Sequence, residues 1–428
     1  MSIKAILKKI EETEVPQVKT AAIAYSGGLD SSLGIELLRR VYKAEKIVAI
    51  TVDVGQGKEE IVEGRRKAKA LKIKPIELDG TEEFTTQWLP LAIKANSNYN
   101  GYPVSTSMTR QLIARMVAEE AAKHGCDAVL EGSSGKGNDQ YRMHNVFKYF
   151  SPDLKVLVPV RDFDLTRYEE EEVCKHWKVP VTENITGGDD KTMWCRSIAS
   201  GAVDLNQPLP DDIWMWLVPP KKASAKGESV KIEFRGGVPV ALNGREMPLD
   251  KLIPKLNVIA GRNGIGKIDM FEDGIMDLKS REIYEAPAAH VILKLHADLE
   301  QACLTKEEVQ FKKMIDAKWA YMTYHGEWYH PLKRSLDAYI ESTQAFVNGV
   351  YKVDLYKGNI DITFRESATS LFSPEIRSIK SRGFDQRQCA NAAKIRGLPF
   401  EILARRNQAA AAAEKAAKKK ARKKSKKK

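Results

Sequence analysis

The sequence predicts an α/β fold in which a doubly wound parallel sheet is followed by an α+β domain and a C-terminal extension. Early in the chain, short apolar runs alternate with amphipathic helical segments, which is typical of parallel strands covered by helices on both faces. From about residue 180 the pattern changes to period-2 hairpins separated by long amphipathic helices. The expected units are residues 1–175, 176–372, 373–408 and 409–428.

The first unit is expected to begin with a strand that ends at Ala24 and a helix that starts near Leu29, where leucines recur at i, i+4 and i+8. A later helix should close at His124-Gly125, since glycine suits the left-handed position after a helix. The other expected elements are strands at 47–52, about 75–78 and 127–131 and helices near 58–71 and 108–124.

Three polar, glycine-bearing turns follow the predicted strands, at residues 26–32, 53–57 and 132–139. The carboxyl ends of parallel strands meet at one edge of a sheet, and ligands of doubly wound sheets bind beyond that edge. We therefore expect these turns to surround a ligand.

The second unit is expected to contain two β-hairpins. Apolar residues alternate with polar ones on both sides of Gly236-Gly237 and of Lys357-Gly358-Asn359. Amphipathic helices are expected near 248–260 and 305–348. Residues 373–408 form an extension, expected to be helical in part, that could pack on a neighbouring subunit.

The positive charge of the chain is concentrated at its C-terminal end. The 428 residues carry a net charge of +12, and residues 409–428 contain ten Lys or Arg and one Glu, so this tail carries +9 and the rest only +3. An alanine- and lysine-rich segment has no apolar face to bury, so disorder is expected. The tail could bind nucleic acid or other acidic surfaces nonspecifically through phosphate contacts, or be a solubilising tail without a dedicated partner.

Composition favours a cytoplasmic enzyme. The five cysteines are odd in number, scattered and never in a CxxC pair, and the seven histidines show no metal-ligand spacing, so neither a disulfide framework nor a metal site is predicted. No segment resembles a membrane span or a signal peptide. Without a Ser/His/Asp or Cys/His arrangement, the expected chemistry is transfer between substrates that the protein holds in position.

The first candidate site is Ala24-Tyr25-Ser26-Gly27-Gly28-Leu29-Asp30-Ser31-Ser32. Paired glycines let the backbone approach a ligand closely, and the N-terminus of the following helix points free N–H groups at an anion such as phosphate. A plain strand-to-helix turn capped by Asp30 or Ser31 explains the same pattern, although the flanking serines favour anion binding. No lysine follows the glycines, so this is not a GxxxxGK[ST] loop.

The second candidate is Gly132-Ser133-Ser134-Gly135-Lys136-Gly137-Asn138-Asp139-Gln140-Tyr141-Arg142, directly after a strand. It combines backbone donors, hydroxyls and both signs of charge, more than a structural turn needs, and is predicted to be a binding loop. Residues 261–268 also satisfy GxxxxGK. However, Ile268 stands where Ser or Thr must bind Mg²⁺ and the preceding segment is helical, so we expect an ordinary turn there.

Together these stretches resemble a known family. Residues 26–32 are similar to the pyrophosphate-binding loop SGGxD[ST]S of the N-type ATP pyrophosphatases, which cut ATP between the α and β phosphates. Within that superfamily the chain resembles the argininosuccinate synthases from about residue 20 to 370. The resemblance is carried, in the same order, by residues 24–30, 135–140 and 279–288.

The resemblance implies an adenine nucleotide alpha hydrolase-like nucleotide-binding domain at 1–175, a synthetase domain at 176–372 and an oligomerisation extension at 373–408 of a homotetramer. It implies ATP and Mg²⁺ as cofactors and citrulline and L-aspartate as substrates in arginine biosynthesis. The ureido oxygen of citrulline would attack the α-phosphorus to give citrullyl-AMP and pyrophosphate. The aspartate amine would then displace AMP to form argininosuccinate.

The resemblance also assigns individual residues. ATP would be bound by Ala24, Tyr25, Ser26, Gly27, Gly28, Leu29, Asp30, Ser31, Ser32, Val52 and Gly132. Citrulline would be bound by Tyr102, Ser107, Asn138, Arg142, Ser197, Glu272 and Tyr284, and aspartate by Ser134, Asn138 and Asp139. Asp139, paired with the aspartate ammonium, and Arg110, near a carboxylate, would be the catalytic residues. Without the resemblance, Glu272 would be assigned to a solvated turn.

Some features depart from the family pattern. Gly188 stands where the family has a serine before Asp-Glu-Asn-Leu, which removes one hydroxyl contact to citrulline, and the basic tail has no counterpart. Two other functions stay open. One is a related ATP pyrophosphatase that modifies tRNA. The basic tail suggests this function, but the scattered cysteines do not support it. The other is a non-enzymatic RNA-binding protein.

Overall fold

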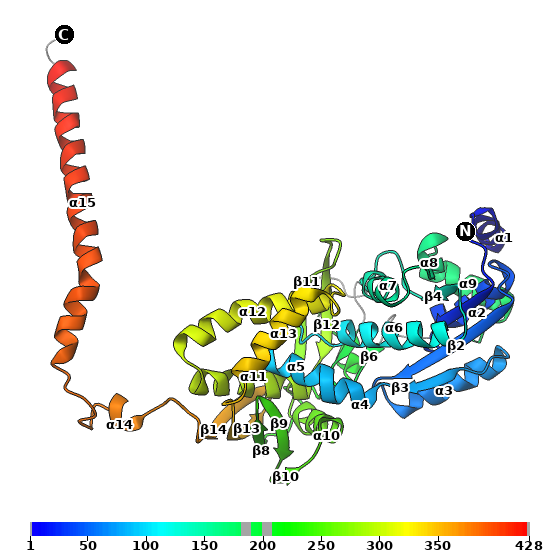
Figure 1. Cartoon of the computed structure of the whole chain (residues 1–428), viewed down its shortest axis with the longest axis horizontal. Coiled ribbons are helices and arrows are strands. Elements are labelled where there is room, and N and C mark those ends of the chain that lie inside the picture. Colours follow the sequence, from blue (N-terminus) through cyan, green and yellow to red (C-terminus); the bar gives the residue numbers. More distant parts are fainter. Residues whose placement is uncertain (1, 181–189, 199–207, 426–428) are drawn as a thin grey trace. The chain divides into compact units, whose positions relative to one another are not determined.

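The computed structural model describes residues 2–180, 190–198 and 208–425. Residues 1–371 form one compact unit and residues 372–428 a second (Figure 1). Gly188 lies outside the described residues, so the effect of the missing serine stays a prediction. The division of the first unit at residues 175 and 176 also stays a prediction.

A parallel sheet organises the first half of the chain. Its five strands have the order β3-β2-β1-β4-β5. They are β1 (Thr20–Ala24), β2 (Lys46–Asp53), β3 (Ile76–Asp79), β4 (Ala128–Leu130) and β5 (Lys155–Leu157). Successive residues of β1 enter different cores, with Ala21 and Ile23 on one face and Ala22 on the other. Because both faces are buried under helices, the predicted doubly wound sheet is confirmed.

Helices accompany these strands, and three of them, at residues 29–40, 58–70 and 106–123, lie where helices were predicted. They are α1 (Ile3–Glu12), α2 (Leu29–Arg40), α3 (Lys58–Ala70), α4 (Thr81–Glu83), η1 (Phe84–Trp88), α5 (Leu89–Lys94), α6 (Thr106–Lys123), α7 (Asp139–Phe150), α8 (Pro159–Asp162) and α9 (Arg167–Trp177). Local sequence sets their ends. Gly125, with φ of +62°, follows α6 as predicted, and Thr166 and Glu169 form a reciprocal capping box at the start of α9.

Two antiparallel sheets make up the second half. One has the order β10-β9-β8-β13-β14 and the other β11-β12-β7-β6. Their strands are β6 (Asp190–Lys191), β7 (Arg196–Ile198), β8 (Glu228–Arg235), β9 (Val238–Leu242), β10 (Arg245–Glu246), β11 (Lys267–Asp273), β12 (Lys279–Glu285), β13 (Gly349–Tyr356) and β14 (Asn359–Glu366). The accompanying helices are η2 (Asp211–Ile213), α10 (Leu249–Arg262), α11 (Pro287–Cys303), α12 (Lys306–Tyr324) and α13 (Pro331–Thr343).

Both predicted hairpins are present, as β8–β9 and β13–β14. The GxxxxGK match lies in the turn between α10 and β11, as predicted, and not between a strand and a helix. The β11–β12 hairpin was not predicted, because buried carboxylates such as Glu272, Glu282 and Glu285 interrupt its apolar alternation.

The second unit contains α14 (Pro374–Arg377) and α15 (Gln388–Ser425). The helix in the extension is as expected. The basic tail was expected to be disordered, but α15 continues through it to Ser425. Alanine and lysine have high intrinsic helix propensity. The side chains of residues 409–422 are exposed, so this part of α15 depends on propensity and not on burial. An oligomerisation role for residues 373–408 stays a prediction.

Among the described helices, none combines the length and the apolar character that a membrane crossing requires.

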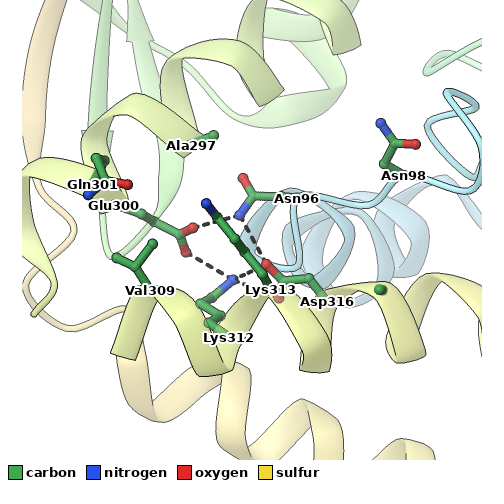
Figure 2. Close-up of a pocket in the computed structure, with 10 residues that line it drawn as sticks. Asn96, Asn98, Ala297, Glu300, Gln301, Val309, Lys312, Lys313 and Asp316 are labelled. Atoms are coloured by element: carbon green, nitrogen blue, oxygen red, sulfur yellow. Dashed lines mark hydrogen bonds and ion pairs between the residues drawn. The ribbon is translucent and has the colours of Figure 1, made fainter. Parts of the chain in front are cut away.

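A cavity of about 330 Å³ lies between α11, α12 and the loop after α5 (Figure 2). Lys312, only 1% exposed, lies at its inner wall. The Lys312 ammonium is 2.8 Å from the Asp316 carboxylate and 3.0 Å from that of Glu300. The Asn96 amide donates to both carboxylates, at 2.6 Å to Glu300 and 3.1 Å to Asp316. These groups satisfy one another and tie the loop at Asn96 to both helices.

One ammonium therefore faces two buried carboxylates. Burial, partly offset by Lys312, raises the pKa of Asp316 to about 7. The unfolded chain releases this proton near pH 4. The folded protein thus binds one more proton than the unfolded chain between about pH 4 and 7, so this residue lowers stability as the pH rises through that window.

Asp316→Asn is expected to flatten the pH dependence of stability between about pH 4 and 7, because the variant cannot bind the extra proton. Urea unfolding at several pH values measures the change, which should be on the order of a few kcal/mol across the window. Asp153→Asn, at an exposed position, is the matched control and should keep the wild-type slope. A wild-type slope in Asp316→Asn would contradict the expectation.

Candidate active site

The three glycine-bearing turns lie at one edge of the parallel sheet, as predicted. β1 lies between β2 and β4 in parallel register. The turns 26–32, 53–57 and 132–139 follow the carboxyl ends of β1, β2 and β4 respectively. The first and last are in contact, since a Cβ on Gly132 would lie 2.9 Å from the Cβ of Asp30.

The turn at residues 26–32 is built for close backbone approach. Gly27 has φ of +78°, and a Cβ there would lie 2.5 Å from the Cα of Gly64 in α3. Gly28 is the N-cap of α2, and its N–H donates to Ser26 Oγ at 3.2 Å. Asp30 and Ser31 lie inside the first turn of the helix and do not cap it. This geometry favours the anion-binding interpretation over the capped turn.

Gly27→Ala is expected to lower ATP-dependent activity by about 100-fold or more. The new methyl group would meet the backbone of Gly64, so the turn must shift by about 1 Å, and misplacement of that size commonly costs this much. Steady-state kinetics with varied ATP measures the loss. Gly125→Ala is the matched control, because Gly125 also has a positive φ but a Cβ there would meet no atom within 4 Å. Equal activity losses in both variants would contradict a specific role for the turn.

Three other residues assigned to ATP make contacts within the protein. Tyr25 is 2% exposed, and its hydroxyl donates to the Gly64 carbonyl at 3.3 Å. Val52 is buried beneath Gly80, whose Cβ would lie 3.3 Å from Val52 Cγ1. Asp30 forms an ion pair with Arg167 of α9. Their contacts with ATP stay predictions.

Asp139 is held between two arginines at the start of α7. Arg110 Nε donates to Asp139 Oδ2 at 2.8 Å, and Arg142 Nη1 donates to Asp139 Oδ1 at 2.8 Å. Burial acts to raise the pKa of Asp139, but the two guanidinium groups outweigh it and lower that pKa. Arg110 also pairs with Asp190 of β6, at 2.5 Å. The cluster thus joins the parallel-sheet half of the chain to the sheet of β11, β12, β7 and β6, the third sheet.

An aromatic cluster adjoins this ion-pair network. The rings of Tyr102 and Tyr284 stack with centroids 4.3 Å apart. Tyr284 OH donates to Glu272 at 2.7 Å, and Tyr324 OH donates to the same carboxylate. Asn138 donates to Tyr324 OH at 2.8 Å. Glu272 is 3% exposed, and burial raises its pKa, so the alternative of a solvated turn is wrong.

Arg142 connects the ion pairs around Asp139 with the aromatic cluster. Its Nε donates to the carbonyl of Tyr324 at 2.8 Å, and its guanidinium carbon lies 4.5 Å from the centre of the Tyr324 ring. Ser197 pairs with Tyr284 across β7 and β12. Ser107 is fully buried in α6, and its hydroxyl has no partner among the described residues. Ser134 lies in the 132–139 turn, where its carbonyl accepts from Gly137 N at 3.2 Å.

Sequence reasoning missed three residues of this region. Tyr324 and Asp190 reach it from distant parts of the chain. No local motif surrounds Tyr324, and Asp190 lies two residues after Gly188, in a stretch that departs from the family pattern. Glu131 directly follows β4, and its carboxylate accepts from Ser133 N at 2.9 Å. Burial raises the pKa of Glu131 to about 7. A carboxyl residue directly before the glycine-rich loop was the one signal that could have identified it.

Comparisons with known proteins cover nearly the whole chain. The arginosuccinate synthase N-terminal HUP domain matches residues 20–180, and the arginosuccinate synthase C-terminal domain matches residues 188–403. The argininosuccinate synthase of Methanococcus maripaludis is 42% identical over 390 residues, which are 90% of this chain and 98% of that protein. The argininosuccinate synthase of Methanopyrus kandleri is 40% identical over 388 residues, with 90% and 98% covered.

Among solved structures, the U34-tRNA thiolase NcsA from Methanococcus maripaludis with its 4Fe-4S cluster is 15% identical. The match covers 42% of this chain and 65% of that one, with a TM-score of 0.28. A likeness at this level supports no conclusion about function.

Proposed function

The chain belongs to the argininosuccinate synthase family and is an ATP-dependent ligase of arginine biosynthesis, and we propose how its residues bind citrulline, aspartate and ATP. The observation that carries the proposal is the position of Asp139. This carboxylate lies between Arg110 and Arg142 in the loop that follows β4. The neighbouring strand carries the 26–32 turn, so ATP phosphates and an amino-acid substrate would meet here.

We propose that Arg142 binds the carboxylate of citrulline and Asp139 binds the ammonium group of aspartate. These two side chains form an ion pair with each other at 2.8 Å. A carboxylate and an ammonium group from the substrates can take over both partners without leaving a buried charge unpaired. Asn138 precedes Asp139 and donates to Tyr324 OH, which in turn donates to Glu272, so Asn138 would contact both substrates.

Glu272 and Tyr284 would close the citrulline side from the third sheet. Their hydrogen bond and the stacking of Tyr284 on Tyr102 fix this wall. Citrulline held against it would present its ureido oxygen to the α-phosphorus of ATP. The C–N ligation then needs two displacements: the ureido oxygen releases pyrophosphate, and the aspartate amine, after losing a proton, releases AMP. Alignment of the reacting groups supplies much of the catalysis in such reactions.

The residues present fit Mg²⁺ that arrives with ATP. Among the residues that the structure describes, no group of three or more His, Cys, Asp or Glu is placed to hold a metal ion by itself. Mg²⁺ bound to phosphates needs only one or two carboxylates and otherwise keeps water, and Asp30 with the Ser26 and Ser31 hydroxyls would supply the protein side. When bound, Mg²⁺ would neutralise phosphate charge.

We also propose a homotetramer in which residues 373–408 contact a neighbouring subunit. Support comes from large apolar side chains of this segment that are exposed within the chain, namely Ile376, Ile379, Phe384, Ile395, Leu398, Phe400, Ile402 and Leu403. Sedimentation or light scattering of the full chain measures the mass. Nonspecific binding of acidic polymers by residues 409–428 stays a proposal, and a chain that lacks them should keep near-normal turnover.

The test of the function is exchange of labelled pyrophosphate into ATP. We expect exchange only when citrulline is present, and AMP release only after aspartate is added. Exchange that ignores citrulline, or that responds to tRNA instead, would contradict the proposed substrates.

A further inference from the structure

Lys67 is a buried lysine directly behind the 26–32 turn. It lies in α3 and is 5% exposed. Its ammonium donates to the Gly27 carbonyl at 2.9 Å. The carboxylate of Glu63 lies 3.9 Å from that ammonium and is itself partly solvated. A charge in this position costs desolvation energy that one carbonyl and a distant carboxylate offset only in part, and burial accordingly lowers the pKa of Lys67.

The backbone of α3 brings Lys67 to this position. Gly64, one turn earlier on the same face of α3, packs against the turn, where its missing Cβ would lie 3.4 Å from the Ser26 carbonyl. Tyr25 OH donates to the Gly64 carbonyl from below. The Gly64 backbone is thus in contact with the turn, and Gly64 and Lys67 together form the part of α3 against which the turn packs.

We propose, on the basis of the ATP assignment made for residues 26–32, that Lys67 is a positioning residue for the pyrophosphate half of ATP. By holding the Gly27 carbonyl, Lys67 fixes the orientation of the turn that precedes α2. The N–H groups at the start of α2 then point towards the ligand. The ammonium also places a positive charge against the Gly27 carbonyl of the turn.

The positive charge of Lys67 would act on the adenylation step. When the bond between the α and β phosphates breaks, negative charge accumulates on the departing pyrophosphate. A fixed cation behind the turn stabilises that charge more strongly than a solvated one, because water is excluded around it. Lys67 should therefore favour ATP binding and adenylation, and should have little influence on citrulline binding or on the attack by aspartate.

The test compares Lys67→Met with Lys69→Met in the full-length chain. Methionine keeps the length and apolar stem of lysine but removes the charge and the donor, and Lys69 is exposed two residues later on the same helix. For Lys67→Met we expect weaker ATP binding and slower pyrophosphate exchange, each by about 10- to 100-fold. The KM for citrulline should stay within about twofold. Lys69→Met should behave as wild type in every measurement.

A second variant tests the charge of Lys67 separately from its hydrogen bond to the Gly27 carbonyl. It also keeps the inference testable if Lys67→Met folds poorly. Lys67→Gln keeps a donor for the Gly27 carbonyl without the charge, and its ATP affinity should also fall. Unfolding midpoints accompany each kinetic measurement. The inference is overturned if the variants bind ATP as wild type does, or if they lose citrulline and ATP affinity equally while unfolding at lower temperature, which is the result for a merely structural lysine.

Direct binding of labelled ATP distinguishes this inference from the proposed function. If the wild-type chain binds ATP but shows no citrulline-dependent exchange, the substrate assignment fails. Weaker ATP binding by Lys67→Met would still support the positioning role in that case.

Discussion

Asp139→Asn is expected to stop the formation of argininosuccinate while leaving citrulline-dependent pyrophosphate exchange measurable. The variant loses the negative charge that would bind the ammonium group of aspartate, but keeps the 26–32 turn. Loss of one partner of a buried charged pair typically costs 2–5 kcal/mol, so kcat/KM for aspartate should fall by about 100-fold or more. Exchange should fall by less than about tenfold, because Arg142, the proposed partner of citrulline, is unchanged.

The matched comparison is Asp190→Asn. Asp190 also pairs with Arg110, but it is not assigned to a substrate, so its loss should change kcat/KM for aspartate by less than about tenfold. If Asp139→Asn reduced exchange and ligation equally, Asp139 would act in adenylation and the assignment to aspartate would be wrong.

Lys312→Met is expected to lower the free energy of unfolding by about 3–5 kcal/mol, the usual cost of removing one partner from a buried ion pair. Without the ammonium, Glu300 and Asp316 face each other with only the Asn96 amide and neighbouring polar groups to stabilise them. Urea unfolding at neutral pH measures the change. The methionine side chain fills the space, so lost packing contributes little.

Lys313→Met is the control for Lys312→Met, since Lys313 is exposed on the same turn of α12. Surface substitutions of this kind usually stay within about 0.5 kcal/mol of wild type. A loss below about 1 kcal/mol in Lys312→Met would show that the network is not a stabilising element.

The sequence predicts those parts of the fold in which local pattern and burial agree. Alternating apolar runs and helical segments predicted the parallel sheet. The glycine-bearing turns predicted which edge of that sheet they share, at the carboxyl ends of its strands. The β11–β12 hairpin was missed because Glu272 and Glu285 occupy positions that an amphipathic strand gives to apolar residues. Buried carboxylates satisfied by distant hydroxyl or backbone donors leave no signal in a local window.

The site was predicted unevenly for the same reason. The 26–32 and 132–142 loops could be identified because each gathers its functional groups within eleven residues. Tyr324 lies 182 residues after Arg142 and contacts it through its backbone carbonyl and its ring, and a contact across that distance in sequence leaves no local pattern. Lys67 looked like one more lysine on a charged helix, and only its burial against Gly27 distinguishes it.

With Arg142 assigned to citrulline and Asp139 to aspartate, as proposed, the ion pair between these two side chains would make the two substrates thermodynamically interdependent. A ligand that takes Arg142 alone leaves Asp139 with one guanidinium partner fewer, and a ligand that takes Asp139 alone weakens the pairing of Arg142. Once one substrate has separated the Asp139–Arg142 ion pair, the other substrate no longer has to supply that free energy. Occupancy by citrulline should tighten aspartate binding, and by reciprocity aspartate should tighten citrulline binding by the same factor.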